Sequence, residues 1–204
     1  MKKRITLLLL LFLFNGIQFI NAQDYTATKS FGKKELAVRE VRRAAITANI
    51  GWKSLTGIGV SYQQYVGKQM GVDLGLGLSL TGVKFGGRFR YLFMEKNFSP
   101  FVSAGFMYGM GLGDVEMEYI TDGNSFSYRI GSSPFGQITG GIEYLSNGGF
   151  LIMANIGYAI LLNDGNYEII HGTPTAEELN VMNAMFGSGM VFEFSIGYAF
   201  GGKK

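Results

Sequence analysis

Apolar and polar residues alternate along most of the chain from Ala44 onward. The clearest stretch is residues 70–80, where methionine, valine and leucine alternate with glycine, aspartate and serine. A period of two is typical of β-strands, whereas the apolar positions of an amphipathic helix recur about every 3.6 residues. The alternation predicts eight strands, at residues 44–52, 58–66, 70–80, 83–93, 98–110, 135–145, 149–161 and 188–200.

The connections between these strands are long at only one end of the predicted sheet. Residues 111–134 and 162–187 form the two long connections, and both follow odd-numbered strands. Antiparallel outer-membrane barrels have this asymmetry, with tight periplasmic turns and longer outer loops. The strand lengths also bracket the roughly 9–11 residues that a tilted strand needs to cross a bilayer. We therefore expect an all-β fold, an eight-stranded antiparallel up-and-down transmembrane β-barrel at residues 44–200.

One face of the predicted strands carries almost no charge, whereas the other collects glycine and polar residues. The alternative, a secreted soluble barrel of the lipocalin or streptavidin kind, would place its larger apolar residues inside and its polar residues in water. The polarity of these strands is the reverse and favours a lipid-facing exterior. The predicted inward polar network consists of Gln63, Asp73, Lys84, Arg88, Arg90, Glu143 and Glu193.

Hairpin turns set which members of this network face one another, because paired residues lie on the same side of a sheet. With residues 81–82 as a two-residue turn, Asp73 falls opposite Arg90. The turn at residues 67–69 places Asp73 opposite Gln63. Eight strands leave an interior about wide enough for side chains, which favours a structural plug of paired charges. A charged constriction in a water-filled pore is the alternative.

Aromatic residues gather on the apolar face at the end of the barrel that has the short turns. Aromatic residues are enriched at both membrane–water interfaces, where they form belts around a barrel. The predicted periplasmic aromatic girdle consists of Tyr91, Phe93, Phe98, Tyr144, Phe150, Tyr198 and Phe200.

Both long connections are acidic. The simplest interpretation is a hydrated outer face, and the alternative is binding of cations or of an unknown basic surface partner. Neither loop has the oxygen-ligand spacing of a calcium loop. Residues 175–178 fit a capping box, which predicts a short helix in the second loop. The acidic residues are Asp114, Glu116, Glu118 and Asp122 in the first loop and Asp164, Glu168, Glu177 and Glu178 in the second.

The first residues have the layout of a secretory signal peptide at residues 1–22. Basic residues 2–4 precede an apolar stretch at residues 5–14, which is too short to span a bilayer. Cleavage removes three of the 18 basic residues and none of the 15 acidic ones, so the formal net charge falls from +3 to zero. This balance gives no support to nucleic-acid binding. Residues 23–43 then form a basic periplasmic segment, either a solvated leader or a short amphipathic helix, and residues 201–204 form a short basic tail.

The composition offers little for catalysis. Glycine accounts for 31 of the 204 residues, there is no cysteine, and His171 is the only histidine. A thiolate nucleophile or a cysteine-bound zinc site needs cysteine, and a lone histidine in a loop lacks the partners that a nucleophile and its base need. We expect no enzyme, no cofactor and no metal site. His171 with Ser188 is the one candidate pair for lipid-modifying chemistry.

The strand pattern of residues 44–200 resembles the small eight-stranded outer-membrane barrels of the OmpA/OmpX type, and more closely the outer-membrane β-barrel domain proteins of Bacteroidota. The last strand ends with Tyr198, Ala199 and Phe200, similar to the assembly signal of this family, and four residues follow it. The resemblance implies a monomer in the outer membrane of a Gram-negative cell, with outer-membrane lipids and the barrel assembly machinery as partners. It also implies a non-enzymatic role in envelope structure or surface interaction. A small passive pore for ions or small solutes is the alternative, and an outer-membrane lipid-modifying enzyme is the third candidate.

Overall fold

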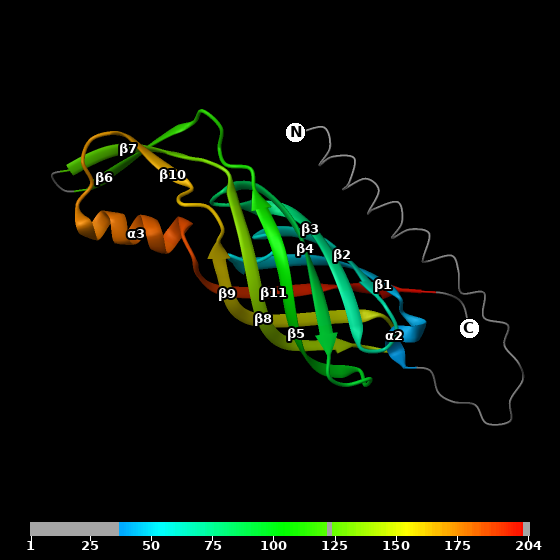
Figure 1. The fold of residues 1–204 in the computed structure, drawn as a ribbon. Helices are drawn as coiled ribbons and strands as arrows, with labels where there is room; N and C mark the ends of the chain where they lie inside the picture. Colours follow the sequence, from blue (N-terminus) through cyan, green and yellow to red (C-terminus); the bar gives the residue numbers. More distant parts are fainter. Residues whose placement is uncertain (1–36, 122–123, 202–204) are drawn as a thin grey trace, which may run out of the picture. The chain divides into compact units, whose positions relative to one another are not determined.

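A computed structural model of the protein describes residues 37–121 and 124–201. The predicted signal peptide at residues 1–22, most of the basic segment that follows it, Asp122 and the last three residues lie outside this range. Eight strands close into an antiparallel barrel, in which the last strand pairs with the first (Figure 1). The predicted eight-stranded, antiparallel all-β barrel is confirmed. The barrel strands are β1 (Ala44–Trp52), β2 (Ile58–Tyr65), β3 (Met70–Ser79), β4 (Gly82–Leu92), β5 (Phe98–Gly109), β8 (Ser133–Leu145), β9 (Phe150–Leu161) and β11 (Gly189–Phe200).

The alternation in the sequence is the physical reason for this fold. Successive side chains of a strand point to opposite faces, so each barrel strand turns its large apolar residues outward. Leu78 and Ile138 are 63% and 69% exposed on this outer face. Small residues let the strands approach on the inner face. A Cβ atom on Gly59 would lie 2.2 Å from the carbonyl oxygen of Leu76.

The hairpin of β3 and β4 differs from its prediction by two residues. The turn occupies residues 80–81, so Asp73 lies opposite Arg88 rather than Arg90. The reason is local, because Gly82 begins β4 with a φ of +80°, a left-handed conformation that glycine adopts without steric cost. A slip of two residues leaves every side chain on its predicted face.

The barrel interior has three layers along its axis. A short-turn cluster of apolar residues fills the end where residues 66–69, 93–97 and 146–149 connect the strands. A long-loop cluster fills the opposite end, and buried polar side chains lie between the two. The short-turn cluster consists of Ala45, Tyr65, Leu92, Phe101, Leu145, Leu151, Met153 and Ala199. The long-loop cluster consists of Leu55, Met107, Phe135, Ala159 and Val191.

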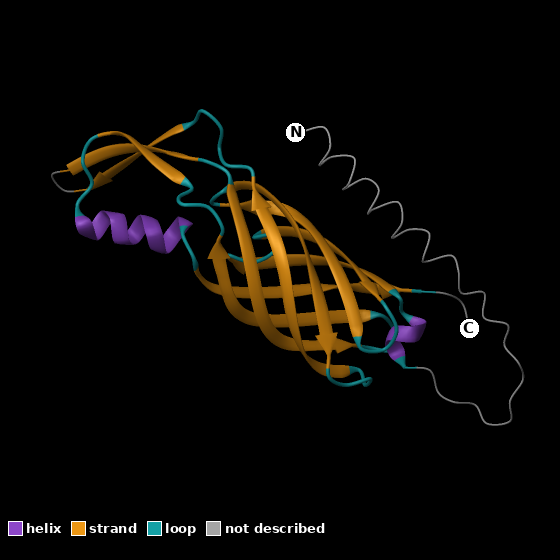
Figure 2. Ribbon diagram, viewed as in Figure 1, coloured by secondary structure: helices purple, strands orange, loops and turns teal. Residues whose placement is uncertain are grey.

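The two long connections contain a second sheet that the sequence analysis did not predict. It has three strands in the order β10-β7-β6. Helix α3 (Ala176–Phe186) lies where the capping box predicts a helix, beside this sheet (Figure 2). It packs on the sheet through Met182 and Phe186. The strands of the second sheet are β6 (Glu116–Thr121), β7 (Asn124–Ile130) and β10 (Tyr167–His171).

A four-residue helix, α2 (Val38–Val41), precedes β1 at the short-turn end of the barrel. Val38 packs against the short-turn cluster. The basic segment thus reaches the barrel with its last residues. Within the part of the chain that the structure describes, no helix is both long and apolar enough to cross a membrane.

Candidate functional site

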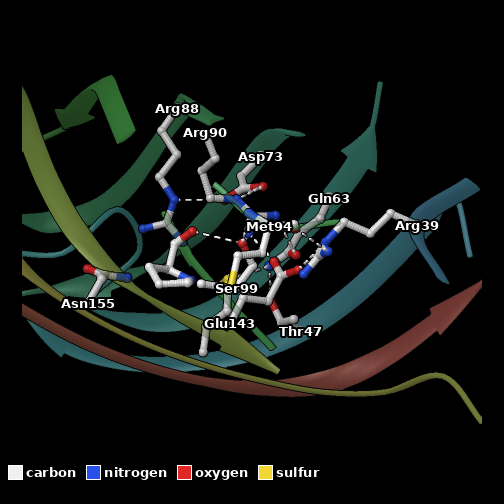
Figure 3. A network of polar contacts seen from close by, with 12 residues as sticks. Arg39, Thr47, Gln63, Asp73, Arg88, Arg90, Met94, Ser99, Glu143 and Asn155 are labelled. Atoms are coloured by element: carbon white, nitrogen blue, oxygen red, sulfur yellow. Dashed lines mark hydrogen bonds and ion pairs between the residues drawn. The ribbon is translucent and has the colours of Figure 1, made fainter. Parts of the chain in front are cut away.

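Arg90 lies at the centre of the polar layer (Figure 3). Its side chain points from β4 into the barrel and is fully buried. Nε donates to Oδ1 of Asp73 at 3.0 Å, and Nη2 donates to Oε1 of Gln63 at 2.9 Å. Nη1 donates to a carboxylate oxygen of Glu143 on β8. The structure therefore brings Gln63, Asp73 and Arg90 together as the sequence predicts, although Arg90 reaches Asp73 diagonally across the sheet.

Arg88 extends the network toward the opposite wall of the barrel. Its Nε donates to Oδ2 of Asp73 at 2.7 Å, and its Nη1 lies 2.7 Å from Oε1 of Glu193 on β11. Glu193 also accepts hydrogen bonds from the backbone N–H of Leu55 at 3.2 Å and from Nδ2 of Asn155 at 3.1 Å. The connection between β1 and β2, which carries Leu55, therefore folds into the mouth of the barrel.

Arg39 of α2 also belongs to the network, and the sequence analysis missed it. Its Nε donates to Oε1 of Glu143 at 2.8 Å, and its Nη1 donates to the carbonyl oxygens of Met94 and Lys96 at 3.2 and 2.8 Å. Arg39 is fully buried, so the interpretation of residues 23–43 as a solvated leader is wrong at this residue. No local pattern marks it, because Glu143 lies 104 residues further along the chain.

These contacts form a chain of alternating charges across the barrel, which we call the ion chain. Three guanidinium groups face three carboxylates, and each residue is at most 4% exposed. Buried charges are costly unless they are paired and hydrogen-bonded, and every member here has a partner of opposite sign. In order, the ion chain is Arg39, Glu143, Arg90, Asp73, Arg88 and Glu193.

Lys84 was predicted in the same network but lies apart from the ion chain. Its Nζ donates to the carbonyl oxygen of Ser54 at 3.2 Å and lies 5.6 Å from the ring centre of Phe135, near the long-loop end. The predicted network contains three acids, together with Lys84 and two arginines. Within the ion chain Arg39 is the third base, and Lys84 is a fourth buried cation outside it.

Bulky side chains cover the ion chain on both sides. The guanidinium group of Arg90 lies 5.6 Å from the ring centre of Tyr65 and 5.5 Å from that of Phe101. On the long-loop side, Thr56 fills the space over Gly75, where a Cβ atom would lie 2.5 Å from Cγ2 of Thr56. Inward glycine at this position therefore makes room for a neighbouring side chain. The arrangement holds charges in fixed pairs and leaves none of them facing solvent.

The structure places the seven aromatic residues of the predicted girdle on the outer face at the short-turn end. Their exposed fractions range from 38% at Tyr91 to 55% at Tyr198. Phe98 pairs with Tyr144 across β5 and β8, and Phe150 pairs with Tyr198 across β9 and β11. Together they form an aromatic belt at one end of the barrel, over the adjacent strands β4, β5, β8, β9 and β11; none of the seven lies on β1, β2 or β3.

The predicted acidic loop residues differ in their surroundings. Glu116 of β6 pairs with Arg129 of β7 at 3.1 Å. Glu178 lies in the predicted loop but is only 8% exposed, because it forms the predicted capping box at the start of α3. Its Oε2 accepts hydrogen bonds from the backbone N–H and the hydroxyl of Thr175. The other described members of the set are exposed, namely Asp114, Glu118, Asp164, Glu168 and Glu177.

His171 and Ser188 are not joined in the structure. His171 lies on β10 opposite Ser127 of β7. The hydroxyl of Ser188 accepts a hydrogen bond from the backbone N–H of Leu161 at 2.9 Å. No hydrogen bond links His171 to Ser188 among the residues described. Over the same residues, no group of three or more histidine, cysteine, aspartate or glutamate side chains is placed to hold a metal ion.

No family model matches the chain, and no curated protein matches it. Among solved structures, it is similar to the N-terminal β-barrel domain of Pseudomonas aeruginosa OprF, with 14% sequence identity and a TM-score of 0.48. The superposition covers 78% of this chain and 98% of the OprF domain.

Proposed function

We propose that this protein is an integral outer-membrane β-barrel with a closed lumen, serving envelope structure or surface interaction and carrying no enzymatic activity. One observation carries the proposal: the outer wall is apolar, while the interior is filled by the ion chain between two apolar clusters. Lipid requires an apolar exterior, and a soluble barrel would have the opposite polarity.

The outer wall supports the membrane location. On β3 alone, Leu74, Leu76 and Leu78 are 50–63% exposed. Leaving such a side chain in water rather than burying it costs roughly 1.5–3 kcal/mol. Soluble monomers rarely expose a contiguous apolar patch of more than about a few hundred Å². Because β1 pairs with β11, the barrel also has no open edge of unpaired backbone groups, which a lipid environment would penalise.

The two ends of the barrel support an outer-membrane orientation. Short turns and the aromatic belt occupy one end, and the second sheet with α3 occupies the other. In outer-membrane barrels the short turns face the periplasm. The exposed carboxylates of the long loops then face the outside of the cell, where a basic surface partner would meet them. Membership among the outer-membrane β-barrel domain proteins of Bacteroidota stays a prediction from the sequence pattern.

A small passive pore is the second candidate, since several inward positions carry glycine and so have no side chain to fill the lumen. Neighbouring side chains occupy that space in the structure. A Cβ atom on Gly105 would lie 2.5 Å from Cβ of Arg88, and Gly75 is covered in the same way by Thr56. This filling favours a plug over a conducting lumen.

Two measurements test the proposal on the full chain. A folded membrane barrel in detergent is expected to migrate differently on a gel before and after boiling. A protein that stays soluble without detergent and shows no such shift would contradict the membrane location. In planar bilayers we expect no stepwise current from the wild-type protein. If the wild-type protein gives current steps and Arg90→Ala makes them larger, the pore is established instead.

A further inference from the structure

We propose that the long-loop rim of the barrel binds an anionic amphiphile, with one acyl chain in a cavity under α3 and its carboxylate or phosphate group between Lys53 and Lys84. The cavity has a volume of about 340 Å³. It lies where β1 and β2 meet the turn between β3 and β4, and Phe186 of α3 covers it. No residue of the ion chain lines it.

The cavity crosses the rim of the barrel. Trp52, Ile58 and Leu78 line it from the outer face, where they are 42–66% exposed. Phe135 lines it from the inner face and belongs to the long-loop cluster. One side of the cavity is therefore continuous with the apolar outer wall, and the other side reaches into the barrel. An acyl chain that lies along the outer wall can enter without crossing water.

The cavity holds two ammonium groups that lack acidic partners. Lys84 is 3% exposed, and its Nζ donates to a backbone carbonyl oxygen, that of Ser54. Lys53 donates to the carbonyl oxygen of Gly187. Neither lysine belongs to any of the ion pairs found among residues 37–121 and 124–201. Every arginine of the ion chain has a carboxylate within ion-pair distance, whereas Glu193 attracts the buried Lys84 only at longer range and the partly buried Lys53 has no ion pair among the described residues.

A buried cation without a counter-charge is costly, and an anion between the two lysines would offset that cost. Partial burial lowers the pKa of Lys53 below its usual value, because burial disfavours the charged form. Pockets with mostly apolar walls and a few placed polar groups are typical of small-molecule sites. Apolar walls with two cations match an acyl chain with an anionic headgroup and do not match a zwitterion or a free inorganic anion.

Native mass spectrometry of the full chain in an uncharged detergent tests this site. The probes are oleate and lysophosphatidic acid, which carry a carboxylate and a phosphate, with lysophosphatidylcholine and inorganic phosphate as comparisons. We expect one molecule of an anionic probe per barrel, and markedly weaker retention of both comparison compounds. Preference for oleate over lysophosphatidic acid, or the reverse, identifies the headgroup. Equal retention of lysophosphatidylcholine and the anionic probes would overturn the proposal.

Substitutions locate the binding. Lys53→Gln and Lys84→Gln should each weaken anionic-probe binding by about tenfold, because each removes a charge-assisted contact. Met185→Trp, at a residue that lines the cavity, should reduce chain binding without any change of charge. The matched control is Lys68→Gln, at the opposite end of the barrel. If Lys84→Gln does not fold, Lys53→Gln and Met185→Trp carry the test. Wild-type affinity in both would refute the site.

Discussion

Glu143→Gln is the substitution that tests the ion chain most directly, because two buried guanidinium groups depend on this one carboxylate. Oε1 accepts from Nε of Arg39 at 2.8 Å, and Oε2 accepts from Nη1 of Arg90. All three side chains are fully buried. Glutamine keeps the size of the side chain but has one carbonyl oxygen in place of two carboxylate oxygens. One guanidinium group therefore loses its acceptor, and the ion chain is left with one uncompensated positive charge.

The magnitude follows from what each arginine retains. Arg90 keeps Asp73 and Gln63, whereas Arg39 keeps only backbone carbonyl oxygens. Removing one partner of a buried ion pair costs about 3–5 kcal/mol, since the other charge stays buried. We expect the free energy of unfolding to fall by about this amount, which lowers the folding equilibrium constant by at least about a hundredfold.

Urea titration of the barrel in lipid vesicles measures this loss. Trp52 is the only tryptophan of the chain and lies on the outer face, so its fluorescence reports loss of the membrane-inserted state. Glu95→Gln is the matched control, because Glu95 pairs with Lys68 at 2.9 Å on the surface. Such a surface pair contributes about 0–1 kcal/mol. If both variants unfold cooperatively and Glu143→Gln lowers the free energy of unfolding no more than Glu95→Gln does, the reasoning is refuted.

Three further substitutions, and one control, have defined outcomes. Leu76→Arg places a charge on the outer face and should lower the free energy of unfolding by about 2–4 kcal/mol at the bilayer midplane. The folded band on a gel of vesicle samples should then be lost, and an unchanged band would contradict a lipid-facing wall. Thr175→Ala removes the α3 cap and should cost about 1 kcal/mol locally, so limited proteolysis should cut the loop faster while the barrel stays resistant. Gly75→Val should lower stability by about 1–3 kcal/mol through collision with Thr56, whereas Gly165→Ala, with no atom within 4 Å of its Cβ, should leave urea midpoints unchanged.

The barrel could be predicted from sequence because its walls obey a two-residue period over whole strands, with opposite polarity on the two faces. Register was harder to predict, since the turn between β3 and β4 depends on the backbone conformation of Gly82. An error of two residues preserved the faces but exchanged Arg88 and Arg90 as the direct partner of Asp73. Side chains as long as arginine bridge both positions, which is why the predicted contact survives the wrong register.

The second sheet and Arg39 were missed for different reasons. Residues 116–121 do alternate, with glutamate against methionine and tyrosine, so β6 left a signal that the length of the loop obscured. Arg39 left no such signal, because its burial depends on Glu143 and on turn carbonyls that only the closed barrel brings together. Lys84 is the opposite case to Arg39. The two-residue period predicted its inward position, but not its separation from the carboxylates of the ion chain.

The members of the ion chain lie far apart in the sequence, and this separation constrains how the barrel can assemble. The hairpin of β3 and β4 brings Asp73 together with Arg88 and Arg90, so by itself it carries an excess positive charge within the ion chain. Glu143 arrives with β8, Glu193 with the last strand β11, and Arg39 from the segment before the first strand. A partly inserted barrel would hold unbalanced charge in a low-dielectric interior, which is a costly state. The ion chain therefore becomes electroneutral in the same step that closes the β1–β11 seam, and a partly assembled barrel carries an unpaired buried charge.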